Sequence, residues 1–411
     1  MTDLFWPGDE RAGDLFTGGA WLRAMADVEQ AWLDALAGAG IAPARADLAG
    51  LAGPGDLPAL ARAAEDGGNP VIALVGLLRE RAGGPAAAWI HRGLTSQDVV
   101  DTALVLCARD TVARLRADLR HQAGSLARLA RAHRGTVMAG RTLTQHAVPV
   151  TFGLKAAGWL AGVLDAAGTL GRLRFPVQVG GAAGTRSAVV ALAGARGSAD
   201  PVAAAEALAG DAARRLGLAA DPPWHTRRAT VTALGDALVT CTDAWGRLAA
   251  DVAVLSRPEI AEVSEPAADG RGGSSAMPHK RNPVLSVLVR RAALAAPPLA
   301  STLHLASALA VDERPDGAWH AEWATLRTLA RRTATAASQT RELLAGLTVD
   351  ADRMAATAAG AREALTAEAR AVAAFTGADA AGHGPPDGTG AAGALVDAVL
   401  DRADRFLEAH A

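Results

Sequence analysis

A run of apolar residues at alternating spacings of three and four constrains the fold of this chain more than any other feature. It is sustained over 25 residues and consists of Val231, Leu234, Leu238, Cys241, Trp245, Leu248, Val252 and Leu255. This periodicity predicts one helix of about 37 Å with a continuous apolar seam. Because a short element cannot cover a seam of that length, other long helices must pack beside it.

Three further segments have the length and the apolar spacing to supply those neighbours. They are residues 101–133, 151–173 and 284–309. The last contains Pro297 and Pro298, and two adjacent prolines remove two amide donors, so we expect that helix to be kinked or broken. Ala and Leu dominate the composition and aromatic residues make up only 4% of it, which favours helix over sheet. The sequence therefore predicts an all-α fold.

The predicted organisation is an elongated central helix bundle with a smaller helical region on each side. Residues 96–330 hold the long periodic segments, residues 1–95 form the first flanking region, and residues 331–411 form the second. Within the second region, residues 382–388 combine Gly, Pro and Asp, which predicts a loop or a linker. His383 lies in that stretch and is expected to be exposed to solvent.

Charge and cysteine content exclude several classes of protein. With 41 basic and 43 acidic side chains the formal net charge is −2, and no basic tract stands alone, so neither nucleic acid nor a membrane is an expected partner. The first seven residues lack a basic region followed by an apolar run, which predicts a cytoplasmic protein. Cys107 and Cys241 lie among apolar neighbours, so we expect buried free thiols. No cluster of residues has metal-ligand spacing.

The segment with the most specific chemistry is residues 273–283, GSSAMPHKRNP, which we call the signature loop. It follows a glycine-rich stretch and places two hydroxyls, an ammonium and a carboxamide within ten positions. Lys280 and Asn282 can bind a carboxylate while Ser274 acts on the adjacent carbon, so the segment suits a dianionic substrate. The alternative is an ordinary solvated loop, but a string this long and mixed is discriminating.

The signature loop resembles that of the fumarase/aspartase superfamily, whose members add or eliminate across a carbon–carbon bond next to a carboxylate. Residues 91–98, HRGLTSQD, and residues 140–147, GRTLTQHA, resemble the other two active-site regions of that superfamily, in the same order. We call them the first and second motif segments. The resemblance covers about residues 85–325. It implies a homotetramer in which three subunits each contribute one segment to a site, with no metal and no organic cofactor.

Within the superfamily, several features are similar to the 3-carboxy-cis,cis-muconate cycloisomerase family, which acts in the breakdown of aromatic acids. They are residues 312–314, 317–323 and 223–226. Adenylosuccinate lyases carry a histidine where this chain has Leu143, and their N-terminal tyrosine contact is impossible in a chain without tyrosine. The resemblance therefore implies lactonisation of 3-carboxymuconate by addition of a carboxylate oxygen to an alkene carbon.

Two other functions stay open. One is a β-elimination lyase that releases fumarate from a substituted succinate, adenylosuccinate-like or nitrosuccinate-like, since it would use the same motif residues. The other is a non-catalytic structural protein on the same scaffold. A structural protein would not need the polar residues that occur together here, namely Ser274, Lys280, Asn282, His91 and His146. In either enzymatic case the substrate is a small di- or tricarboxylate.

The resemblance implies a role for each candidate residue. Ser274 handles the carbon-bound proton, although an unperturbed serine is a poor base and needs nearby positive charge. His146 is a general acid or a carboxylate contact, and His91 is the second catalytic histidine. The enediolate-like intermediate needs cations and donors around its carboxylate. For His320 and Arg314 two interpretations stay open: His320 lines the substrate site while Arg314 binds a carboxylate, or the segment is a helix start at which tryptophans pack. The expected substrate-binding residues are Thr95, Ser96, Gln97, Gln145, Lys280, Asn282, Arg314 and His320.

Overall fold

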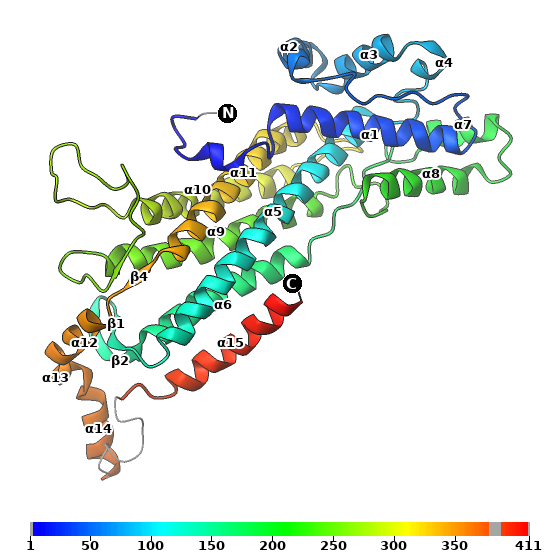
Figure 1. Cartoon of the computed structure of the whole chain (residues 1–411). Coiled ribbons are helices and arrows are strands. Elements are labelled where there is room, and N and C mark those ends of the chain that lie inside the picture. Colours follow the sequence, from blue (N-terminus) through cyan, green and yellow to red (C-terminus); the bar gives the residue numbers. More distant parts are fainter. Residues whose placement is uncertain (1–2, 378–387, 410–411) are drawn as a thin grey trace. The chain divides into compact units, whose positions relative to one another are not determined.

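The computed structural model describes residues 3–377 and 388–409, and most of these residues are helical (Figure 1). The prediction of an all-α fold is confirmed. The expected loop at residues 382–388, with His383, lies largely outside the described residues. The longest helices are α5 (Ser96–Ala132), α6 (Phe152–Gly171), α9 (Ala229–Leu255), α10 (Val284–Ala308) and α11 (Gly317–Ala345).

Shorter helices and two small sheets complete the described chain. The helices are η1 (Asp9–Ala12), α1 (Gly18–Gly38), η2 (Pro54–Asp56), α2 (Leu57–Gly67), α3 (Val71–Ala82), α4 (Gly84–Ala87), α7 (Ser187–Ala195), α8 (Pro201–Leu216), α12 (Ala351–Gly360), α13 (Arg362–Leu365), α14 (Ala367–Thr376) and α15 (Ala392–Glu408). The strands pair antiparallel as β1 (Val137–Thr142) with β2 (Gln145–Thr151) and β3 (Val263–Ser264) with β4 (Thr348–Val349).

The chain divides into two compact units, each made of three stretches of sequence. Unit 1 consists of Met1–Ala113, Arg172–Asp236 and Pro298–Arg332, and unit 2 consists of Arg114–Gly171, Ala237–Pro297 and Thr333–Ala411. Both units are therefore discontinuous in sequence, because α5, α9, α10 and α11 each contribute to both. The division into three contiguous regions, 1–95, 96–330 and 331–411, stays a prediction.

The apolar seam of α9 is buried, as the sequence predicts: Leu238, Cys241, Trp245 and Leu248 have no exposed surface. In unit 2 the indole Nε1 of Trp245 donates to Oε1 of Gln122 at 2.7 Å, which joins α9 to α5. At Gly246 an added Cβ would lie 2.4 Å from Cβ of Ala293, so only glycine allows α9 and α10 to approach this closely. The long helices of the same chain cover the seam.

Helix α10 departs from the prediction, because it runs without a break through Pro297 and Pro298. Its packing compensates for the lost backbone hydrogen bonds, since apolar side chains on one face are buried on both sides of the proline pair; these are Leu285, Val289, Ala292, Ala296, Ala300 and Leu303. The length and mean hydropathy of α10 would also allow it to span a membrane. It carries Arg290 and Arg291, and we interpret it as a bundle helix.

Candidate active site

The first motif segment lies in unit 1 and leads into the start of α5. Its last residue, Asp98, is fully buried. The Asp98 carboxylate accepts hydrogen bonds from backbone N–H groups of Thr95 at 2.9 Å, Gly180 at 2.8 Å and Gly181 at 2.9 Å, and it contacts Nε2 of His225 at 2.9 Å. One buried carboxylate thus fixes the segment against two other parts of the chain, as buried anions require.

A buried charged cluster lies one helical turn further along α5. The Arg228 guanidinium donates to the carboxylates of Asp101 at 2.8 and 3.0 Å and of Glu322 at 2.5 Å, and Trp319 Nε1 donates to Asp101 at 2.9 Å. Burial alone would lower the pKa of Arg228, but the two carboxylates outweigh it and raise this pKa. Burial raises the pKa of Glu322, and Arg228 opposes that shift. The cluster keeps its central cation charged.

Gln97, a predicted substrate contact, belongs to this buried layer. Its side chain has no exposed surface, and its Nε2 donates to Asp101 at 3.1 Å and to the carbonyl oxygen of His225 at 3.0 Å. Ser96, also predicted to bind substrate, is only 9% exposed. Within the described structure the Gln97 side chain supports the start of α5, and Ser96 is the first residue of that helix.

Thr95 and Arg314, both predicted to bind substrate, lie together. Nη1 of Arg314 donates to Oγ1 of Thr95 at 2.8 Å, and the guanidinium carbon lies 5.7 Å from the ring centroid of Trp319. Arg314 is exposed on this side and carries no ion pair among the described residues. A fixed, exposed guanidinium beside a hydroxyl is suited to bind a carboxylate.

His320 is held by the backbone. Its Nε2 lies 2.7 Å from the carbonyl oxygen of Gly68 and its Nδ1 lies 3.0 Å from that of Asp316. The ring also contacts Trp319 and Trp323, with centroid distances of 5.1 and 4.7 Å. Of the two interpretations from the sequence, this geometry favours the helix start with packing tryptophans.

His91, by contrast, has a side-chain partner. Its Nδ1 lies 2.6 Å from Oε1 of Glu29, a residue of α1 with no exposed side-chain surface. The backbone of His91 has a φ of 65°, in the left-handed region that non-glycine residues seldom adopt. Glu29 escaped the sequence interpretation because it stands 62 positions away in an apolar helical pattern, where nothing in the sequence marks it.

The second motif segment forms the central part of the β1–β2 hairpin of unit 2. Here the prediction of helices alone misses a small sheet, in which Arg141 pairs in register with His146. The Arg141 guanidinium binds the buried carboxylate of Glu262 at 2.8 and 3.0 Å, which fixes the hairpin. His146 and Gln145 are exposed, so they stand near the free end of the hairpin.

The signature loop is open by comparison. Among the described residues, Oγ of Ser274 accepts only from backbone N–H groups of its own loop, Met277 at 3.2 Å and Ala276 at 3.4 Å, and the Lys280 side chain is exposed. Asn282 donates from Nδ2 to the carbonyl oxygen of Gly272 at 3.0 Å. The base of the loop surrounds a cavity of about 640 Å³. Among the described residues of unit 2, no hydrogen bond joins this loop to the hairpin.

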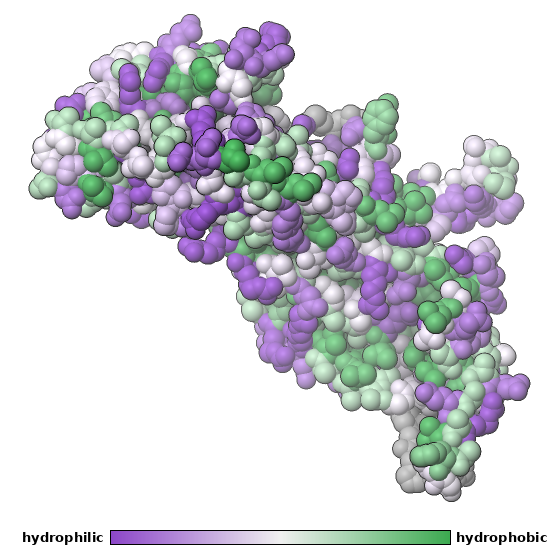
Figure 2. Space-filling model, turned by 180° about the vertical axis from the view of Figure 1, so that it is seen from behind, coloured by the Kyte–Doolittle hydropathy of each residue, from purple (hydrophilic) through white to green (hydrophobic). Residues whose placement is uncertain are grey.

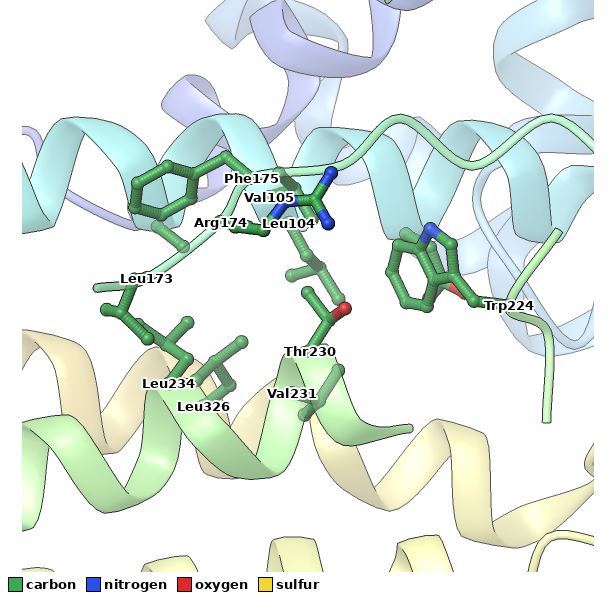
Figure 3. A pocket seen from close by; sticks show the side chains of 12 residues that line it. Leu104, Val105, Leu173, Arg174, Phe175, Trp224, Thr230, Val231, Leu234 and Leu326 are labelled. Atoms are coloured by element: carbon green, nitrogen blue, oxygen red, sulfur yellow. The ribbon is translucent and has the colours of Figure 1, made fainter. Parts of the chain in front are cut away.

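A second cavity lies within unit 1, lined by apolar side chains that include Leu104, Val105, Phe175 and Trp224 (Figure 3). Its volume is about 20 Å³, which is room for roughly one water molecule. It is too small for a di- or tricarboxylate. The described residues also contain no group of three or more His, Cys, Asp or Glu side chains that could hold a metal ion.

Comparison with known proteins agrees with this geometry. Residues 67–296 match a family described as lyase. The chain is 49% identical to nitrosuccinate lyase of Streptomyces davaonensis (82% of this chain, 72% of that protein) and 42% identical to 3-carboxy-cis,cis-muconate cycloisomerase of Pseudomonas aeruginosa (81% and 72%). The crystal structure of 3-carboxy-cis,cis-muconate lactonizing enzyme from Pseudomonas putida covers 96% of this chain and 97% of its own, with a TM-score of 0.77 and 31% identity. The resemblance inferred from the motifs is confirmed: the chain belongs to the lyase family of the fumarase/aspartase superfamily and is an enzyme of that family.

Proposed function

We propose that this enzyme transfers a proton at the carbon next to a substrate carboxylate and makes or breaks a bond at the neighbouring carbon. The observation that carries the proposal is the trio of Ser274, Lys280 and Asn282 on the signature loop, where Lys280 is exposed and Ser274 and Asn282 are half-buried. Ser274 exchanges the proton, and Lys280 with Asn282 binds the carboxylate that receives the developing negative charge. Arg314 with Thr95 binds a second carboxylate.

The first substrate class to test is a substituted succinate. The relative with 49% identity is named a nitrosuccinate lyase, and a succinate carries two carboxylates, for which Lys280 and, from another subunit of a shared site, Arg314 are the proposed partners. Removal of the proton from one carbon and loss of nitrite from the next gives fumarate, and the electron pair of the broken carbon–hydrogen bond becomes the double bond. His146 is proposed as a general acid or a carboxylate contact.

The second candidate is lactonisation of 3-carboxy-cis,cis-muconate. The relatives at 40 and 42% identity are named 3-carboxy-cis,cis-muconate cycloisomerase, and the P. putida structure is named a 3-carboxy-cis,cis-muconate lactonizing enzyme. In the sequence, residues 312–323 favour this reaction. The bond changes are the reverse of an elimination: a carboxylate oxygen adds to one alkene carbon and a proton is delivered to the next. The same side chains serve both directions.

One assay distinguishes the candidates. The purified protein is incubated separately with nitrosuccinate, adenylosuccinate and 3-carboxy-cis,cis-muconate, while fumarate and nitrite formation and the ultraviolet absorbance of the diene are followed. The Ser274→Ala variant gives the background rate for each substrate. Turnover of the first substrate alone establishes the lyase, and loss of the diene alone establishes the cycloisomerase. No turnover of any of the three contradicts the proposal.

We also propose that the protein is a homotetramer whose sites are shared between subunits. Support comes from α10, where Val287, Leu294 and Leu305 are 54, 78 and 60% exposed. Their spacings of 7 and 11 residues put them on one helical face. Figure 2 shows hydrophobic side chains exposed in several areas of the surface that it displays. An uncovered apolar face of this length suits a second subunit. A cytoplasmic location stays a prediction.

Two experiments test the assembly. Replacement of Leu294 and Leu305 by lysine should yield smaller species in sedimentation, whereas Leu238 and Leu248 are buried within the chain and a charge there would unfold it. Inactive His91→Gln and Ser274→Ala variants, mixed and reassembled, should regain part of the activity because some sites would combine intact segments. An active monomer, or mixing without any rescue, would contradict shared sites.

A further inference from the structure

The pair of Glu29 and His91 has a geometry that constrains the tautomer of the histidine ring. Oε1 of Glu29 lies 2.6 Å from Nδ1 of His91. An ionised carboxylate can only accept hydrogen bonds, so the proton of a neutral imidazole resides on Nδ1. The lone pair then lies on Nε2, the nitrogen that has no hydrogen-bond partner among the described residues. The His91 side chain is 19% exposed and thus reachable from solvent.

The environment of Glu29 is unusual for a structural residue. Its side chain has no exposed surface, and its second oxygen, Oε2, is buried without a hydrogen-bond partner in the described part of the chain. Burying a carboxylate costs several kcal/mol and one histidine contact repays only part of that cost. An apolar pair of similar size would stabilise this position at least as well.

The backbone of His91 adds a second cost. Its φ of 65° places a side chain with Cβ in the left-handed region, a conformation that is strained for any residue other than glycine. The neighbouring bonds hold this conformation: Trp32 Nε1 donates to the carbonyl oxygen of Arg92 at 2.7 Å, and Arg79 donates to that of Ile90 at 2.7 Å. His91 thus combines a strained backbone with a side chain that contacts a buried carboxylate.

We propose that Glu29 is a positioning residue: it holds the ring of His91 in one orientation and as the Nδ1–H tautomer, and so presents Nε2 to the substrate. The inference rests on the proposed function, in which His91 acts at the site. Glu29 itself touches neither the substrate nor a reacting atom. Its effect on the reaction passes through the imidazole, as a carboxylate behind a functional histidine commonly does.

The test is Glu29→Gln, which preserves the volume but allows the amide to accept from Nδ1–H or to donate to an unprotonated Nδ1. We expect kcat to fall at least about tenfold with little change in KM. Nitrogen NMR of ring-labelled histidine should show one tautomer for His91 in the native protein and a mixture in the variant, with the His91→Gln spectrum assigning the signals. A role in stability alone would lower the urea midpoint and leave kcat unchanged, even with a mixed tautomer.

Gln30→Ala is the matched control on the same helix. The Gln30 side chain donates to the carbonyl oxygen of Ala46 at 3.1 Å and accepts from N–H of Leu48 at 2.7 Å, with no bond to His91. It should lower the urea midpoint without changing the tautomer or kcat. An unchanged His91 tautomer in Glu29→Gln would overturn the inference, even in an active enzyme. If the native protein turns over none of the substrates, the proposed function fails, whereas the NMR result still decides the role of Glu29.

Discussion

The first motif segment and the signature loop carry comparable chemistry but are held in opposite ways. Trp32 donates to the carbonyl oxygen of Arg92 in the segment, Arg79 donates to that of Ile90 just before it, and the Asp98 carboxylate binds three backbone N–H groups and His225. In the signature loop, residues 275–281 are exposed, and within the described part of the chain Ser274 hydrogen-bonds only to the backbone of its own loop. The first region is fixed by side chains from distant parts of unit 1, and the second depends on itself.

This difference indicates how the two regions contribute to catalysis. A segment fixed before the substrate arrives can orient a carboxylate without loss of its own conformational entropy. A loop with few bonds must gain contacts from the substrate or from another subunit before its serine is placed productively. We therefore expect mutations around the segment to affect folding first, and mutations in the loop to affect substrate binding or turnover without affecting folding.

The largest expected effect is the loss of stability in Arg228→Met. The substitution leaves the carboxylates of Asp101 and Glu322 buried without their shared cation, which should cost about 3–5 kcal/mol. Urea denaturation measures it. The control is Arg227→Met, because the Arg227 side chain is 65% exposed and lies 3.7 Å from Asp221, so its loss should change stability by less than about 0.5 kcal/mol. Equal effects would show that the buried cluster does not anchor the region.

Ser274→Ala comes next and should lower kcat about a hundredfold with little change in KM, since it removes proton transfer and leaves the carboxylate contacts. The urea midpoint should equal that of the native protein, because Ser274 makes no hydrogen bond to a described residue outside its loop. Ser275→Ala removes the neighbouring exposed hydroxyl and should reduce kcat far less. Near-normal turnover of Ser274→Ala would remove the serine from the mechanism.

Lys280→Met has a smaller expected effect. An ammonium–carboxylate hydrogen bond contributes about 1.5 to 3 kcal/mol, in the ground state and in the transition state alike, so KM should rise and kcat/KM should fall at least about tenfold. Lys280 is exposed, so stability should not change. Arg281→Met, at the next exposed position, is the control. An unchanged KM would contradict carboxylate binding by Lys280.

The sequence predicts the long helices well because their periodicity is strong. The segment expected at residues 151–173 is found as Phe152–Gly171, and the one at 284–309 as Val284–Ala308. The prediction that α10 is kinked or broken at Pro297 and Pro298 is wrong, because tertiary packing outweighs the local loss of two hydrogen bonds. The sequence does not predict the β1–β2 hairpin, because polar and apolar residues do not alternate clearly along its two strands.

The site residues show the same contrast: features that depend on neighbouring residues in the sequence can be predicted, and contacts between distant residues cannot. Ser274, Lys280 and Arg314 are candidate site residues because they lie in recognisable sequence motifs. The structure adds that Arg314 lies against Thr95. The partner of His91 could not be predicted, because Glu29 reaches it only through the packing of α1 against the segment. The assignment of substrate-binding roles to Gln97 and His320 stays a prediction, although both side chains bind other parts of the protein.

The smallest expected effect concerns the thiols, which should not react in the folded protein. Cys107 lies on α5, beyond the first motif segment, and Cys241 lies on α9; both are buried and free, as the sequence predicts. Burial raises the pKa of each thiol to about 12, so at pH 8 only about one thiol in ten thousand is ionised. A disulfide reagent should therefore modify neither cysteine within minutes, whereas both should react at once in urea. Rapid labelling of Cys107 in the folded protein would show that α5 opens readily, and the contrast between an anchored segment and a free loop would then fail.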